Sequence, residues 1–150
     1  MFERFTQKAI KSIMLAQEEA ATMGVHEVGS EHLLLGLAAV EDSISAKALN
    51  SVGLDLETTR KLATSLKYES TAKQEQPEVQ FTENSKRALE ISWDEARIEE
   101  VRYIGAEHLL LGILRLGEGK AAEMLAAHDT DIEALRSEVI KLRETETQQN

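Results

Sequence analysis

An internal repeat is the feature of this sequence that most restricts its fold. A shift of 76 residues places the six residues Glu31–Gly36 on the identical six residues Glu107–Gly112. The same frame, without a gap, gives 18 identities among the 62 pairs that begin at residues 5–66. Because an unbroken six-residue match inside such a frame is very improbable by chance, the chain is a tandem duplication.

The duplication divides the chain of 150 residues into four segments. The first copy covers about residues 5–66 and the second about residues 81–143. The segment 67–80 between them is polar, contains the only proline, and is expected to be a linker. Residues 144–150 are also polar and are expected to form a frayed tail. Since a copy of about 60 residues is marginal alone, we expect the two copies to pack face to face as one domain.

Apolar residues in each copy recur at helical spacing and follow capping residues. The helices expected in the first copy run from Thr6 to about Gly24, from Ser30 (as its cap) to about Val40, from Ser45 to Ser51, and from Asp55 onward. The second copy gives the same order, with Thr82 in the place of Thr6. No credible strand is found. The predicted fold class is therefore all-α: an eight-helix bundle made of two pseudo-twofold, four-helix repeats.

The composition argues against several classes of partner. The chain has 27 acidic and 17 basic residues and a formal charge of −10, which disfavours nucleic acid and anionic membranes. It has no cysteine, which excludes disulfides, thiolate zinc sites and cysteine nucleophiles. No stretch is apolar enough for a signal peptide or a membrane span. We expect a cytoplasmic location, with the chloroplast stroma as the alternative.

Motifs for catalysis or cofactor binding are not found. The sequence lacks a phosphate loop, a dinucleotide-binding glycine motif and a serine nucleophile elbow. His26-Glu27 begins a zinc-protease motif, but Ser30 stands where the second histidine must be, and the scattered histidines predict no metal site. We therefore expect no enzyme activity, no metal and no cofactor. Trp93 is expected to be a packing residue of its helix.

The repeated Glu-His segment has two interpretations. Its leucines fit a buried central helix, and His32 and His108 fit packing or hydrogen-bonding roles. Glu31 and Glu107 fall in a first helical turn, where the helix dipole favours a carboxylate by about 0.3–1 kcal/mol. Alternatively, each glutamate receives a cationic group of a ligand beside the exposed amides of a neighbouring helix start. Spacing alone favours the first interpretation.

Four segments of the sequence resemble those of a known family. They are Met1–Thr6, Gln17–Ala20, Gly29–Leu37 with its second-copy partner, and Gly117–Ala122. Together they resemble the double Clp N-terminal motif, over residues 1–143, and the start is most similar to the ClpC type of Hsp100 chaperone. The resemblance implies an eight-helix, pseudo-twofold domain in front of AAA+ ATPase modules, which docks adaptors and substrates for unfolding and proteolysis.

The resemblance also implies a ligand. Some ClpC-type members bind phosphorylated arginine through the threonine that opens a repeat and the glutamate of the Glu-His segment. The matching positions are Thr6 with Glu31, and Thr82 with Glu107. A carboxylate would pair with the guanidinium, while the helix N-terminus and the hydroxyl would receive the phosphate. The chain departs from the family pattern at Ser30 and Ala106, where threonine is usual, and its first copy lacks the glycine-rich connection.

Two function classes follow from this resemblance. The first is a protein-binding module that docks adaptors or substrates, phosphoarginine-marked ones included, for delivery to an AAA+ unfoldase. The second is a stand-alone accessory subunit that binds the Clp protease core or the chaperone ring and regulates its assembly. The acidic second half would suit a basic partner in the second class: residues 1–75 have 8 bases and 11 acids (−3), and residues 76–150 have 9 and 16 (−7). As an isolated domain the protein is expected to be a monomer.

Overall fold

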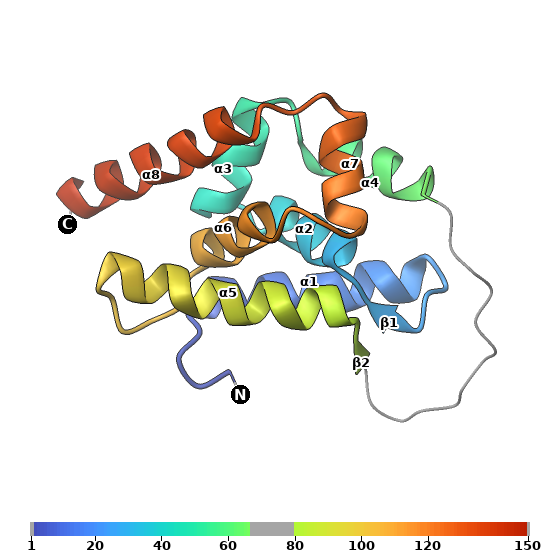
Figure 1. Ribbon diagram of the computed structural model, residues 1–150, viewed down its shortest axis with the longest axis horizontal. Coiled ribbons are helices and arrows are strands. Elements are labelled where there is room, and N and C mark those ends of the chain that lie inside the picture. The colour runs from blue at the N-terminus through green and yellow to red at the C-terminus, as the bar shows by residue number, and fades with distance from the viewer. Residues whose placement is uncertain (1, 67–79, 150) are drawn as a thin grey trace.

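The computed structural model describes residues 2–66 and 80–149 (Figure 1). The predicted linker over 67–80 therefore lies outside the described residues, apart from Gln80. In the described part the elements are α1 (Gln7–Thr22), β1 (Glu27–Val28), α2 (Ser30–Ala39), α3 (Ile44–Ser51), α4 (Leu56–Thr64), β2 (Gln80–Phe81), α5 (Glu83–Glu99), α6 (Ala106–Leu116), α7 (Lys120–Ala127) and α8 (Ile132–Gln149). The prediction of an eight-helix, all-α fold is confirmed, since the two strands have two residues each.

Capping residues start most helices where the sequence predicts. The Oγ1 atom of Thr6 accepts a hydrogen bond from the N–H of Ala9, and Thr82 caps α5 in the same way. The prediction for α2 was wrong by one residue, because the cap is Gly29 and Ser30 is already helical. The third helix begins one residue earlier than expected, behind Ser43 as its cap. The side chains of Thr6, Ser43 and Thr82 each accept a hydrogen bond from an amide that the helix leaves unpaired.

The last helix is longer than the sequence analysis indicated. We expected the chain to leave it near Glu144, but α8 continues to Gln149. No glycine or proline interrupts this stretch, and its glutamates and glutamines are good helix formers. Side chains also hold it, since the Nζ atom of Lys47 in α3 lies 3.2 Å from a carboxylate oxygen of Glu146. Residues 144–149 of the predicted tail are therefore part of α8.

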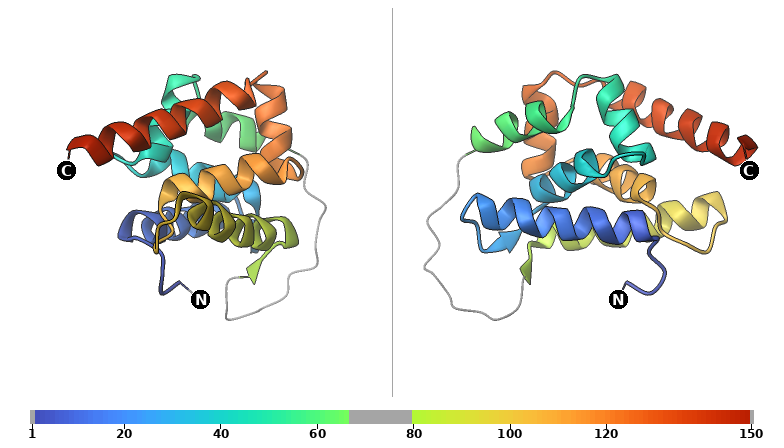
Figure 2. Two further views of the ribbon diagram at one scale, coloured as in Figure 1. Left: turned by 60° about the vertical axis from the view of Figure 1, so that its left-hand side comes forward. Right: turned by 180° about the vertical axis from the view of Figure 1, so that it is seen from behind.

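The helices form three layers, with α2 and α6 in the middle (Figures 1 and 2). Helices α1 and α5 cover one side of this pair, and α3, α4, α7 and α8 cover the other. The third helix of each copy contacts the other copy: α3 packs against α6 and α8, and α7 packs against α2 and α4. The central leucines are the heart of the core, and burying one such side chain contributes about 1.5–3 kcal/mol. Fully buried examples are Leu34, Leu35, Leu37 and Leu110.

Glycine permits the close approach of α1 to α2. A Cβ atom added to Gly36 would lie 2.0 Å from the backbone oxygen of Ser12 in α1. The equivalent position in the second copy, Gly112, would bring a Cβ within 2.5 Å of the backbone oxygen of Ala88 in α5. The glycine that ends the repeated six-residue segment is therefore required by the contact between the first and second helices of each copy.

The two copies exchange short extended segments, which the sequence analysis did not predict. Strand β1 pairs in parallel with β2, with Val28 opposite Phe81. An isolated parallel bridge joins Phe5 to Ile104. Adding 76 to Phe5 gives Phe81, and adding 76 to Val28 gives Ile104, so the two pairings are equivalent by the internal repeat. The segment before the first helix of each copy thus pairs with the segment before the second helix of the other.

Candidate functional site

The predicted threonines lie beside the predicted glutamates of the opposite copy. The backbone N–H of Thr82 donates to the carbonyl of Val28 at 3.0 Å, three residues before Glu31. By the same contact, Thr6 donates to the carbonyl of Ile104 at 2.9 Å, three residues before Glu107. Each site therefore combines the first-helix start of one copy with the second-helix start of the other.

The structure does not bring together the same-copy pairs named in the sequence analysis. Thr6 precedes α1, whereas Glu31 follows it, and a helix of 16 residues is about 24 Å long. Helix α2 then returns along α1, so that Gly36 reaches Ser12 and Glu31 stays near the far end of α1. The pairs to consider are Thr82 with Glu31 and Thr6 with Glu107.

Each glutamate folds back over the glycine that caps its own helix. A Cβ atom on Gly29 would lie 1.9 Å from Oε1 of Glu31, and one on Gly105 would lie 2.1 Å from Oε1 of Glu107. The two carboxylates differ in access, because Glu31 is only 2% exposed and Glu107 is partly exposed. Glycine at both caps leaves room for the carboxylate, and the second-copy carboxylate is the more accessible to a cationic ligand.

The histidine after each glutamate caps the same helix. The Nδ1 atom of His32 accepts a hydrogen bond from the N–H of Gly29 at 2.9 Å, and Nδ1 of His108 accepts one from Gly105 at 2.8 Å. Both imidazoles are fully buried. The hydrogen-bonding role expected for these histidines is confirmed, and it takes the place that glutamate or glutamine has in a common capping box.

The second copy has a charged group behind its histidine. The Nε2 atom of His108 lies 2.6 Å from Oε1 of Glu99, and Oε2 of Glu99 lies 3.1 Å from Nε of Arg143. The first copy has Met23 at the position equivalent to Glu99.

Burial lowers the pKa of His32 below its ordinary value, an effect that the carboxylates of Glu31 and Glu19 partly oppose. The neutral imidazole is therefore the favoured form of His32.

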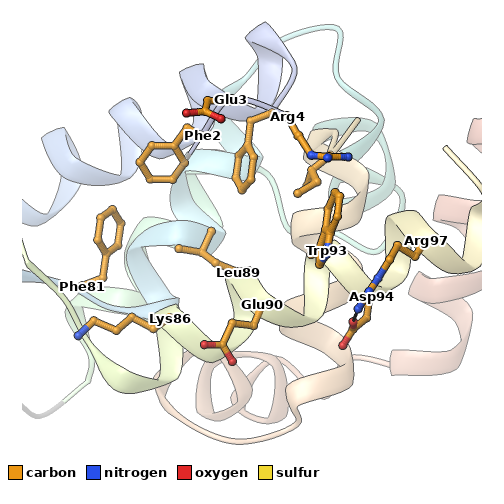
Figure 3. A pocket seen from close by; sticks show the side chains of 12 residues that line it. Phe2, Glu3, Arg4, Phe81, Lys86, Leu89, Glu90, Trp93, Asp94 and Arg97 are labelled. Carbon is orange, nitrogen blue, oxygen red and sulfur yellow. Dashed lines mark hydrogen bonds and ion pairs between the residues drawn. The ribbon is translucent and has the colours of Figure 1, made fainter. Parts of the chain in front are cut away.

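A groove of about 720 Å³ opens beside these helix starts (Figure 3). Its apolar lining comes from the segment before α1, from β2, from α5 and from the segment before α6: Phe2, Phe5, Phe81, Leu89, Trp93 and Ile104. Its charged rim consists of Glu3, Arg4, Lys86, Glu90, Asp94 and Arg97. Phe2 stands edge-on to Phe5 at a centroid distance of 5.2 Å and faces Phe81 at 6.5 Å. The groove thus combines aromatic surface with charges of both signs.

Trp93 lines this groove, in addition to the packing role expected from the sequence. The guanidinium carbons of Arg4 and Arg97 lie 4.7 and 5.5 Å from the centre of its ring, within cation–π range. The equivalent residue in the first copy is Gln17. Sequence reasoning missed the groove, although the loss of repeat symmetry at Trp93 was a signal that this face of α5 differs from the same face of α1.

Comparison with known proteins decides the family. The family model described as the Clp repeat (R) N-terminal domain matches residues 4–128 and 80–149, and so covers most of the chain. The chain belongs to the Clp N-terminal domain family. The resemblance inferred from the repeated motifs is thereby confirmed, and the protein is a module of the Clp chaperone type.

Several Clp chaperones contain a segment similar to this Clp N-terminal domain. It is 46% identical over 142 residues to the chloroplastic chaperone protein ClpC1 of Oryza sativa subsp. japonica, covering 95% of this chain and 15% of that protein. It is also 46% identical over 142 residues to the ClpA homolog, an ATP-dependent Clp protease ATP-binding subunit, of Guillardia theta, covering 95% of this chain and 17% of that protein. The chain therefore spans about a sixth of the length of these curated relatives.

Solved Clp N-terminal domains share the fold. The N-terminal domain of the chaperone ClpD from Arabidopsis thaliana superposes with a TM-score of 0.78 at 26% identity, covering 96% of this chain and 97% of that one. The Hsp104 N-terminal domain from Candida albicans gives a TM-score of 0.75 at 15% identity, covering 94% and 92%, and shows the fold alone. Among the described residues, this Clp N-terminal domain has no helix that could span a membrane and no metal-binding group of three or more histidines and carboxylates.

Proposed function

We propose that this Clp N-terminal domain docks adaptors or protein substrates for delivery to an AAA+ unfoldase. The observation that carries the proposal is the groove between Phe2 and Trp93. Its volume of about 720 Å³ is in the usual range for binding sites, about 300–1,000 Å³, and would hold several side chains of an extended segment. Aromatic surface with a charged rim is the composition that protein-binding sites favour.

The aromatic residues in the groove supply the expected affinity. Trp93 is partly buried and lies between two guanidinium groups, and tryptophan is among the residue types that most often dominate binding energy. Phe2 and Phe81 face each other at the other end of the groove. A peptide with apolar side chains at both ends would therefore contact both copies of the repeat at once.

Dephosphorylated casein, an unfolded protein, is a suitable probe for the groove. We expect Trp93→Ala to weaken its binding at least about tenfold, the effect of losing a dominant contact residue. Ile98→Ala is the matched control, because Ile98 lies on the same helix, is 69% exposed and is not part of the groove. Circular dichroism of each variant checks that the helices remain. Equal affinity of wild type and Trp93→Ala for casein would contradict docking in this groove.

Phosphoarginine recognition is the finer part of the proposal. The guanidinium would pair with Glu31 or Glu107, and the phosphate would lie at the start of the facing first helix, at Thr82 or Thr6. Titration of a phosphoarginine peptide, with the unphosphorylated peptide as control, tests it. We expect Glu107→Gln to weaken binding more than Glu31→Gln, since Glu107 is the more exposed carboxylate. Equal affinity of wild type and both variants would contradict the assignment.

Three further expectations from the sequence stay predictions. We propose that the domain is not an enzyme, and ATP or peptide hydrolysis clearly above blank would contradict this. An accessory role would appear as binding to the Clp protease core or chaperone ring without any effect of Trp93→Ala on substrate capture. The cytoplasmic location stays a prediction, and the chloroplastic names of the relatives favour the stromal alternative.

A further inference from the structure

Two buried histidines cap the helices that carry the candidate glutamates, and the proposed function gives them no role. Each Nδ1 accepts a hydrogen bond from a backbone N–H, which can only donate. The Nδ1 atoms of His32 and His108 therefore carry no proton. Since a neutral imidazole has one proton, that proton is on Nε2 in both rings.

The surroundings of His108 agree with this tautomer. Its Nε2–H donates to Oε1 of Glu99 at 2.6 Å, and the other oxygen of Glu99 accepts from Arg143 at 3.1 Å. Both ring nitrogens of His108 are thus engaged, one as acceptor and one as donor. A second proton can be added only at Nδ1, where the N–H of Gly105 already points at the lone pair.

We propose that His32 and His108 are proton-sensitive caps of α2 and α6. Protonation of either ring at Nδ1 replaces an acceptor with a donor, so the hydrogen bond from the capping glycine must break. The glutamate that precedes each histidine lies over that glycine, since its Oε1 atom would be 1.9 Å (Glu31) or 2.1 Å (Glu107) from a Cβ atom added there. Loss of the cap therefore releases the carboxylate of Glu31 or Glu107 from its place. The geometry makes acid the signal that loosens the candidate sites.

The charged and titratable groups that face each ring are different. His32 has Glu31 on its own helix, 3.9 Å from Nδ1, and Glu19 on α1, which Arg60 of α4 holds. His108 faces Glu99 of α5, the Arg143 side chain of α8 through that carboxylate, and the ring of Tyr103 at 6.1 Å. Glu107 adjoins it on α6. At His32 the carboxylates of Glu31 and Glu19 partly oppose the lowering of the imidazole pKa by burial.

Regulation of ligand binding by this cap rests on the proposed function of the two glutamates, so the test needs no ligand. Nitrogen NMR of the uniformly ¹⁵N-labelled full chain reports the protonation of each ring nitrogen, and the amide signals of Gly29 and Gly105 report the caps. Between pH 7.5 and 5.5 ordinary glutamates, with a pKa of about 4.3, stay charged. We expect unprotonated Nδ1 at pH 7.5, and amide shifts of the glycines that follow ring protonation with the same midpoint.

A capping residue that does not titrate gives the matched control. Glutamine is a standard acceptor at this helical position, so His32→Gln or His108→Gln keeps an acceptor for the glycine N–H. In each variant we expect the amide of the glycine that caps the same helix to keep its chemical shift across the pH range. The capping glycine of the other copy, whose histidine is unchanged, should still respond.

Three results would overturn the proposal. The first is a proton on Nδ1 at pH 7.5. The second is ring protonation that leaves the glycine amides unmoved, and the third is a pair of rings that stay neutral down to pH 5 in the folded protein. The wild-type spectra decide all three, so the proposal remains testable if a glutamine variant does not fold. These spectra are recorded without ligand. A failure to bind phosphoarginine or casein would therefore contradict the proposed function without deciding whether the histidines act as proton-sensitive caps.

Discussion

The carbonyl oxygen of Val28 accepts a hydrogen bond from the backbone N–H of Thr82, 3.0 Å away, and this contact assigns each candidate site to both copies of the repeat. The segment that carries Val28 leads into α2, whereas Thr82 caps α5. The equivalent hydrogen bond, from the N–H of Thr6 to the carbonyl of Ile104, repeats the arrangement with the two copies reversed. Residues that share a site are therefore distant in sequence.

The first prediction concerns energetic coupling in phosphoarginine binding. Two residues that contact one ligand or one another give non-additive effects, whereas residues in separate sites give additive ones. We expect the effects of Thr82→Ala and Glu31→Gln on the binding free energy to be non-additive. The effects of Thr82→Ala and Glu107→Gln should add within about 0.5 kcal/mol. Calorimetric titration of the single and double variants measures this. Coupling of Thr82 with Glu107 instead would contradict the cross-copy sites.

The second prediction concerns the glycines between paired helices. Gly36→Ala should destabilise the domain by about 1–3 kcal/mol, since the new Cβ meets the backbone oxygen of Ser12, which a side-chain rotation cannot move. Gly112→Ala should cost less, because its Cβ would lie 2.5 Å rather than 2.0 Å from a backbone oxygen. Urea unfolding gives both values. A higher midpoint for Gly36→Ala than for wild type would show that helix propensity outweighs the close contact.

The third prediction concerns the left-handed residue that ends α5. Glu100 has φ = 65°, and its equivalent in the first copy is Gly24, with φ = 73°. We expect Glu100→Gly to stabilise the domain by about 0.5–1 kcal/mol, the strain relieved less the entropy that glycine adds to the unfolded chain.

The reverse change at the equivalent position is the control for this prediction. Gly24→Ala should destabilise the domain although its Cβ would meet nothing within 4 Å, so only the backbone conformation can be responsible. Thermal unfolding of both variants checks the pair. A lower melting temperature for Glu100→Gly would indicate that the Glu100 side chain makes a contribution larger than the backbone strain.

The fourth prediction concerns pH. Burial lowers the pKa of His32 in the folded protein below its unfolded value, so the unfolded chain binds more protons as the pH falls. The contribution of neutral His32 to the free energy of unfolding is therefore complete above about pH 6.5 and decreases below it, by at most about 1.4 kcal/mol per pH unit. Urea unfolding at pH 7.5 and 5.5 should show a smaller loss for His32→Gln than for wild type. An equal loss in both would contradict the prediction.

The repeat and the helix signals predicted most of the fold. The ungapped frame of 76 residues predicted equivalent helices in the two copies, and Thr6 and Thr82 are caps as expected. Asp55, expected as the start of the fourth helix, is the cap of α4. The start of α2 was predicted one residue too late, because serine is a common helix cap and Ser30 was taken as the cap. In the structure Gly29 is the cap, and the side chain of His32, three residues later, accepts the hydrogen bond from its N–H. The end of α8 at Gln149 was not predicted, because polar composition does not by itself end a helix and the apolar pattern stops at Leu142.

The candidate site was harder to predict, since its parts come from different copies. Strands of two residues leave no alternating pattern in the sequence, so the exchange of Phe5 and Phe81 between copies could not be read from periodicity. Self-comparison shows which residues are equivalent and says nothing about which copy they contact. The groove likewise depends on how the segment before α1 crosses α5, and only Trp93, with Gln17 as its equivalent, marked the place in advance.

The reciprocal pairing of Phe5 with Ile104 and of Phe81 with Val28 has a consequence for the origin of the domain. Each half supplies an arm that the other half receives, which is the arrangement of a dimer whose subunits swap their N-terminal arms. Two separate molecules of one ancestral half could have made the same contacts without any peptide link between them. In a single chain that holds both halves, each half can change independently. The two halves now differ at equivalent positions: Gln17 corresponds to Trp93, and Met23 corresponds to Glu99. Two identical subunits could not differ in this way.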